Sequence, residues 1–212
     1  MKYTQNYMSR AEVDFDAGTV LVETVDEADP PASLRSAIVT TLLTPDDPRS
    51  VDLFTDSAVT LTSDRKPYLA GLVVDAAGRP VATPAGAEGF AEVLLARAGN
   101  RQVTLQSGTR TALFVKFPMV ANFQNKQAEK YRPVVTRVAQ QYQVSPSLVY
   151  AVIKVESNFN PFAVSSAPAY GMMQPPEVYE RLRTKLPHEE TRQYVVKVVQ
   201  SRKQFVSRLP DG

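Results

Sequence analysis

Apolar and polar residues alternate in several short stretches of the first half of the chain, which is the pattern of half-buried β-strands. The stretches "AEVDF" and "TVLVETV" flank the turn residues "DAG" and predict a β-hairpin. "RQVTLQ" and "TALFVKF" around "SG" predict a second hairpin, and "YLAGLVVD" and "RPVATP" around "AAG" predict a third. The first half is therefore expected to contain an antiparallel sheet.

Apolar residues at helical spacing predict helices between these strands. "PPASLRSAIVTTLL" places Leu34, Ile38 and Leu42 on one helical face. "TPDD", Thr44–Asp47, predicts the start of another helix, because a threonine cap and a first-turn proline precede acids that favour the positive helix end. "AEGFAEVLLARAG" predicts a short amphipathic helix that ends at Gly99.

The pattern changes near Asn122. "NFQNKQAE" is polar and typical of a linker, and the residues beyond it favour helices and connecting loops, with His188 in a loop or at a helix start. We therefore predict an α+β chain with two domains. Residues 1–121 form a mixed α/β domain with antiparallel strands, and residues 122–212 form an all-α domain.

Composition narrows the classes of function. The chain has 212 residues, 43% hydrophobic and 22% charged, as expected for a globular protein of one or two domains. It has no cysteine and one histidine, which excludes disulfides, thiol catalysis and zinc sites of the Cys or His-rich type. No phosphate-binding glycine loop or metal-ligand cluster is present in the sequence, so we expect no cofactor and no metal. No apolar run has the length of a membrane span, and "MKYTQNYMSR" is not a signal peptide.

Charge is unevenly distributed. Residues 1–125 carry 11 basic and 15 acidic side chains, whereas residues 126–212 carry 13 basic and 7 acidic ones. The second half therefore suits an anionic partner, although solvated helix faces account for the same charge equally well. We expect no binding to nucleic acid.

The strongest candidate for chemistry is Glu156. "VSPSLVYAVIKVES" predicts a helix with Ser145 as its N-cap and Pro146 in its first turn. Its apolar spacing puts Glu156 on the same stripe as four residues: Leu148, Val149, Val152 and Ile153. Burial and the negative helix end both disfavour a charged carboxylate, and a carboxylic acid kept protonated suits a general acid. The alternative is an ordinary glutamate that closes a helix in solvent.

A second carboxylate is not close by in the sequence. Hydrolysis of a glycoside usually needs two carboxylates that flank the bond, and the nearest acids are Glu129 and Glu177. The residues by themselves therefore leave the partner of Glu156 open.

Several stretches resemble the lytic murein transglycosylases, which have a goose-type lysozyme-like fold. "ESNFNPFAVSSAPAYGMMQ", Glu156–Gln174, is similar to the signature of that family, and "ETRQYVVKV" resembles its closing motif. "AEKYRPVVTRVAQQYQVSPSLVYAVIKVES" resembles the two helices that precede the signature. "KYTQNYMSRAEVDFDAGTVLVETVD", "AIVTTLLTPDDPRSVDLF" and "FPMVAN" resemble the N-terminal domain of the membrane-bound type C members.

The resemblance implies an all-α lysozyme-like second domain and a non-hydrolytic cleavage of peptidoglycan glycan strands. In the family, the bond between N-acetylmuramic acid and N-acetylglucosamine breaks and a 1,6-anhydromuramyl product forms. The resemblance implies that Glu156 is the single acid and base, that Ser157, Met173 and Gln174 line the sugar groove, and that Tyr194 approaches the site. It also implies a periplasmic monomer, held at the outer membrane by a lipid anchor on a cysteine that this chain does not contain.

The sequence departs from the family pattern after Gln174. Family members carry an Ala-Tyr-Asn-x-Gly motif before the closing motif, whereas here "PPEVYERLRTKLPHEETRQYV" follows directly. A truncated, non-catalytic peptidoglycan-binding or scaffold module is therefore the alternative function. Independently of that, the alternative for Met173 is packing in a core. The alternative for Tyr194 is a place on an apolar stripe of the last helix, with Val195, Val198 and Val199.

Overall fold

The computed structural model describes residues 2–47, 66–106, 108–163 and 188–206, and in the last of these ranges side chains are described from Lys197 onward. The chain divides into two compact units, residues 1–123 and 124–212. An antiparallel sheet with helices forms the first unit and helices form the second. The predicted α+β fold class is confirmed.

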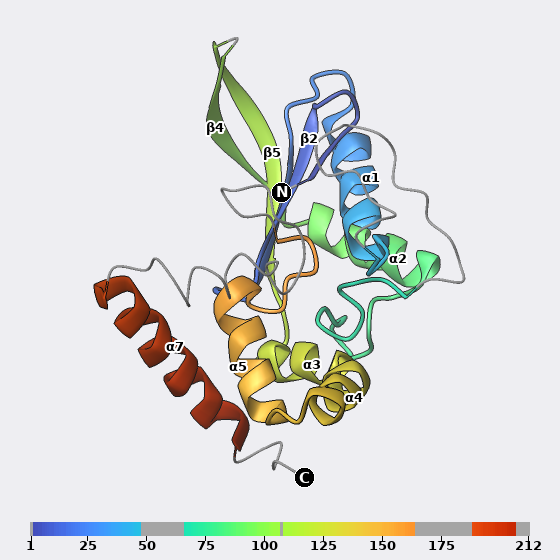
Figure 1. The fold of residues 1–212 in the computed structure, drawn as a ribbon. Coiled ribbons are helices and arrows are strands. Elements are labelled where there is room, and N and C mark those ends of the chain that lie inside the picture. Colours follow the sequence, from blue (N-terminus) through green and yellow to red (C-terminus); the bar gives the residue numbers. More distant parts are fainter. Residues whose placement is uncertain (1, 48–65, 107, 164–187, 207–212) are drawn as a thin grey trace. The chain divides into compact units, whose positions relative to one another are not determined.

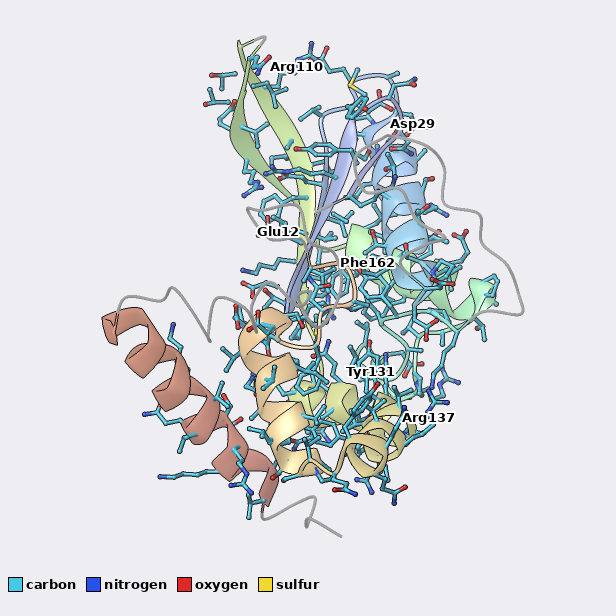
Figure 2. All side chains as sticks on the ribbon, in the orientation of Figure 1. Glu12, Asp29, Arg110, Tyr131, Arg137 and Phe162 are labelled. Atoms are coloured by element: carbon cyan, nitrogen blue, oxygen red, sulfur yellow. The ribbon has the colours of Figure 1, made fainter. Side chains whose placement is uncertain are left out.

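Five antiparallel strands form the sheet of the first unit, in the spatial order β1-β2-β3-β5-β4. Two of the predicted hairpins, β2–β3 and β4–β5, are confirmed (Figure 1). Arg110, labelled in Figure 2, lies near the turn of the β4–β5 hairpin. The strands are β1 (Lys2–Thr4), β2 (Ser9–Asp14), β3 (Thr19–Thr24), β4 (Gly99–Leu105) and β5 (Gly108–Pro118).

One face of the sheet packs against two helices, α1 (Pro30–Leu43) and α2 (Pro84–Leu95). Val20 and Val22 of β3 lie opposite Phe117 and Val115 of β5, and all four side chains are buried. The helical face predicted for α1 is confirmed, because its three apolar residues are fully buried in the same core: Leu34, Ile38 and Leu42. The side chains that recur with a period of two in the strands and of 3.6 in α1 thus pack together in one core.

A buried carboxylate connects strands on the other face. Glu23 alternates with Val22 along β3, and only 3% of it is exposed. Arg10 of β2 and Arg101 of β4 both form ion pairs with it, and Arg101 Nε donates a hydrogen bond of 2.6 Å. The Arg101 guanidinium also lies over the Phe114 ring, 5.6 Å from its centroid. Two cations with good hydrogen bonds compensate the burial of one carboxylate, as such burial requires.

Two predictions near the helices of this unit were wrong. No helix begins at Pro45, because Thr44 ends α1 with its hydroxyl donated to the Thr40 carbonyl, and Pro45 bridges Pro67 instead. The second helix, α2, begins at Pro84 and ends at Leu95, so Gly99 does not end it. Its cap is Thr83, whose hydroxyl accepts from the Gly86 N–H at 3.2 Å.

The third predicted hairpin is present as a turn without strands. Val74 and Pro80 form one isolated antiparallel bridge around the turn. The Asp75 carboxylate accepts hydrogen bonds from the backbone N–H groups of Ala77 and Arg79, both 2.9 Å long. These bonds lower the pKa of Asp75. The turn therefore forms as the sequence predicts, but the residues on either side of it make one isolated bridge and do not extend into strands.

Helices α3 (Phe123–Lys130), α4 (Arg132–Tyr142), α5 (Pro146–Ser157) and α7 (His188–Val206) form the described part of the second half. The stretch predicted as a linker, "NFQNKQAE", is wrong as a linker, because it lies in α3 and buries Gln127 and Ala128. The position of His188 at a helix start is confirmed. On α7, Val198 is buried but Val199 is exposed, which contradicts the predicted stripe at that position. No helix in the described ranges is both long and apolar enough to cross a membrane.

Aromatic rings form the centre of the second unit. The Phe159 ring lies 6.2 Å from that of Tyr150 and 6.0 Å from that of Phe205, and Tyr150 stacks on Phe205 at 5.3 Å. Tyr131, labelled in Figure 2, stacks on Phe159 at 6.4 Å from the junction of α3 and α4. This cluster joins α5 to α7 and to the α3–α4 junction. One of its rings, Phe159, follows the candidate acid Glu156 by three residues.

Candidate functional site

Helix α5 carries Glu156, and its first turn is tied to α7. Ser145 is the N-cap residue as predicted, but its hydroxyl makes no cap hydrogen bond and lies 2.7 Å from that of Ser147. Arg202 of α7 donates from Nε to the buried Ser147 hydroxyl at 3.0 Å. This hydrogen bond fixes the start of α5 against α7.

The buried face of α5 differs from the predicted stripe. The residues that are buried share the side that faces the aromatic cluster: Ser147, Tyr150, Ala151 and Ile153. Leu148, predicted on the stripe, is 40% exposed, so that part of the prediction is wrong. The helix has apolar residues on more than one side, and the position of Phe205 decides which side is covered. Glu156 is half-buried beside this face.

The last turn of α5, which contains Glu156, is closed twice. The Asn158 N–H donates to the Lys154 carbonyl at 2.9 Å, and the Lys154 ammonium donates to the Asn158 side-chain oxygen at 2.8 Å. The Ser157 hydroxyl adds a hydrogen bond of 3.1 Å to the Ile153 carbonyl. Lys154 also places a positive charge in the last helical turn, where it interacts favourably with the negative end of the helix dipole.

Two consecutive residues after this turn have left-handed backbones. Asn158 has φ 48° and Phe159 has φ 60°. Asparagine tolerates this conformation, but for other L-residues it costs about 1–2 kcal/mol. Phe159 is nevertheless held there, because its side chain is fully buried among three other rings. Tertiary packing therefore fixes the direction in which the chain leaves Glu156.

The chain turns again at once. The Asn160 N–H donates to the Ser157 carbonyl at 2.9 Å, and the Asn160 side-chain oxygen accepts from the Phe162 N–H at the same distance. Pro161 between them is buried, and Phe162, labelled in Figure 2, is half-buried. A compact double turn thus follows the candidate acid.

The structure describes two of the five predicted site residues fully. Glu156 and Ser157 lie together in the last turn of α5. Met173 and Gln174 lie outside the described residues, and of Tyr194 the structure gives only the place on α7. The sequence interpretation missed Lys154 and Asn158 around this turn, although an asparagine just after a helix end is a known signal for a left-handed cap.

The described side chains of the second unit are strongly basic. Eight of them are lysine or arginine, whereas the two acidic ones are Glu129 and Glu156. Among the described residues, no group of three His, Cys, Asp or Glu side chains is placed to hold a metal ion. The described side chains of the second unit thus carry a net positive charge, which favours contact with anionic groups.

Tyr150 brings an unpaired hydroxyl into the aromatic cluster. The residue is 1% exposed, and its hydroxyl has no hydrogen-bond partner. Burial raises the pKa of the Tyr150 phenol, which Arg132 lowers and Glu129 raises to a smaller extent. A raised folded-state pKa means that the native state keeps the phenol proton longer than the unfolded state does. Its contribution to stability is therefore complete below about pH 10 and is lost as the pH rises beyond that value.

We expect Tyr150→Phe to leave the protein equally stable or more stable by about 1 kcal/mol, because it removes an unsatisfied buried hydroxyl and keeps the ring. The variant should also lose less stability between neutral and strongly alkaline pH. Urea unfolding at several pH values measures both effects. Tyr142→Phe is the matched control, since Tyr142 is 66% exposed and should change neither quantity. A clear destabilisation by Tyr150→Phe at neutral pH would mean that the hydroxyl is hydrogen-bonded after all.

Two family models match the chain. The model described as "Membrane-bound lytic murein transglycosylase C, N-terminal domain" matches residues 1–130, and the "Transglycosylase SLT domain" matches residues 133–195. The second match contains the helix, the double turn and the candidate acid described above.

Curated relatives with similar sequences carry the same name. Proteins called "Membrane-bound lytic murein transglycosylase C" from Yersinia pestis (strain Pestoides F) and Yersinia pseudotuberculosis serotype O:1b (strain IP 31758) are each 42% identical to this chain over 174 residues. The aligned part is 82% of this chain and 48% of each relative. The chain therefore spans about half the length of the curated relatives it matches.

Proposed function

The chain belongs to the membrane-bound lytic murein transglycosylase C family, and from that premise we propose that it cleaves peptidoglycan as a lytic transglycosylase. The bond concerned is the β-1,4 linkage between N-acetylmuramic acid and N-acetylglucosamine. The observation that carries the proposal is the position of Glu156. It stands in the matched transglycosylase segment, half-buried in a helical turn closed by two hydrogen bonds between Lys154 and Asn158.

The proposed chemistry needs one carboxyl group. Glu156 donates its proton to the glycosidic oxygen as the bond from that oxygen to the muramyl anomeric carbon breaks. The O6 hydroxyl of the same muramyl residue then forms a bond to the anomeric carbon, and the Glu156 carboxylate takes the O6 proton. The products are a 1,6-anhydromuramyl end and a free hydroxyl on the N-acetylglucosamine side. Because the nucleophile belongs to the substrate, no second enzymic carboxylate is required, unlike in hydrolysis.

Substrate contacts belong to the same proposal. Ser157 follows the acid directly in the last turn of α5, and Met173, Gln174 and Tyr194 are proposed to line the sugar groove with it. The basic side chains of the second unit support binding of a polymer whose stem peptides carry carboxylates. By family membership, the site of action is proposed to be the periplasmic side of the outer membrane.

Product analysis tests the proposal directly. Purified peptidoglycan sacculi are digested with the chain, and the released muropeptides are separated and weighed by mass spectrometry. We expect ends that are lighter by one water than hydrolysed ends, because the anhydro bond replaces addition of water. Reducing muramyl ends would indicate a hydrolase instead. Binding to sacculi without any released product would support the non-catalytic module.

A further inference from the structure

The hydrogen bonds at the end of α5 enclose the candidate acid. The bond from the Asn158 N–H to the Lys154 carbonyl closes a loop of backbone that contains residues 155–157, and Glu156 is the middle residue of this loop. The second bond, from the Lys154 ammonium to the Asn158 side chain, spans the same turn from outside. We call these two bonds the Lys154–Asn158 clasp.

The clasp opposes fraying of the helical turn that carries Glu156. The last turn of a helix frays, because its final carbonyl groups have no partner within the helix. A side chain on a fraying turn samples several positions, and misplacement of a catalytic group by about 1 Å can cost a hundredfold in rate. Phe159 anchors the chain beyond the turn, but it lies three residues after Glu156 and does not itself close the turn.

We propose that Asn158, held by Lys154, is a positioning residue that fixes the last turn of α5 and thereby the direction of the Glu156 carboxyl group. Asn158 performs this with its backbone and its side chain together. Its left-handed conformation ends the helix, and its side-chain oxygen receives the ammonium. The inference rests on the proposed role of Glu156 in peptidoglycan cleavage.

The structure supplies variants that separate positioning from folding. Asn158→Gly keeps the left-handed backbone without strain, because glycine adopts positive φ freely, and it removes the oxygen that binds Lys154. Lys154→Met keeps the apolar stem and removes the ammonium. Asn158→Asp keeps both a residue that tolerates this backbone and an acceptor for Lys154, so it is the rescue variant. Lys116→Met removes an exposed charge on β5, in the first unit, and is the control.

Steady-state cleavage of soluble peptidoglycan glycan strands by the full chain provides the first measurement. For Asn158→Gly and for Lys154→Met we expect kcat to fall about tenfold with KM within about twofold of the parent value. Their double variant should be no worse than either single one, because both remove the same contact. Asn158→Asp and Lys116→Met should keep kcat. An unchanged kcat in both single variants, or multiplied losses in the double variant, would overturn the proposal.

Amide hydrogen exchange provides a second measurement that does not depend on activity. In Lys154→Met, the N–H of Asn158 should exchange about tenfold faster, while the amides of Tyr150 and Ala151 in the helix interior keep their protection. Unchanged exchange at Asn158 would contradict the clasp.

The same preparations separate a failure of the proposed role of Glu156 from a failure of the positioning role of Asn158. If Glu156→Gln still cleaves, the proposed role of Glu156 as the acid and base fails. If Glu156→Gln is inactive while the clasp variants are fully active, only the positioning role fails.

Discussion

Replacement of Glu156 by glutamine is expected to reduce peptidoglycan cleavage by about 10²–10⁴-fold, the range that general acid–base catalysis supplies. Glutamine keeps the shape of the side chain and some of its hydrogen bonds, but it neither gives a proton to the leaving oxygen nor takes one from O6. Because one group performs both steps in the proposed mechanism, no other carboxyl is expected to compensate. Release of anhydro-muropeptides from sacculi, followed over time by mass spectrometry, measures the loss.

Glu129→Gln is the matched control for this change. Glu129 lies on α3 in the same unit, is exposed, and loses a carboxyl group in the same way when it is replaced by glutamine. We expect this variant to keep its activity, and both variants to keep the parent melting temperature within about 2 °C, since neither side chain is part of the aromatic core. Undiminished cleavage by Glu156→Gln would show that the acid lies elsewhere, and a parallel loss in Glu129→Gln would indicate a charge effect.

Replacement of Phe159 by alanine is expected to destabilise the second unit by about 3–5 kcal/mol, the usual cost of removing a buried phenyl ring. The ring is fully buried and contacts the rings of Tyr131, Tyr150 and Phe205, so its loss leaves a cavity at the point where the helices meet. Urea denaturation followed by circular dichroism measures the change. The transition of the second unit should move to lower urea concentration.

The left-handed backbone of Phe159 gives this experiment an internal control. Both substitutions remove the ring. Alanine at residue 159 keeps the strain of the left-handed backbone, whereas glycine releases it. We therefore expect Phe159→Gly to be more stable than Phe159→Ala by about 1 kcal/mol, although glycine is normally the more destabilising residue. The opposite order would mean that residue 159 leaves the left-handed region once its ring is gone.

Local sequence signals predicted most of the helices and strands, because turns and helical faces depend on residues that are close together in the chain. The turn residues "DAG" and "SG" fix hairpins between neighbouring strands, and the spacing of Leu34, Ile38 and Leu42 matches one helical face. "TPDD" carries an equally good helix-start signal, yet no helix begins at Pro45, because Thr44 is already used to end α1. "NFQNKQAE" looked like a linker because helix propensity is weak and its two buried residues are not apolar enough to mark a face.

Sequence alone was enough to predict the α+β class, two of the hairpins, the helix that ends at Ser157 and Glu156 as the candidate acid. These follow from periodicity, from turn residues and from a motif whose matching positions are close in the chain. The buried side of α5 depends on tertiary packing, since apolar residues occur on several sides of the helix and the contact of Tyr150 with Phe205 selects one. Tertiary packing also decided the left-handed exit after Glu156. Phenylalanine has no local preference for positive φ, and burial of its ring against residues far away in the sequence supplies the free energy that holds it there.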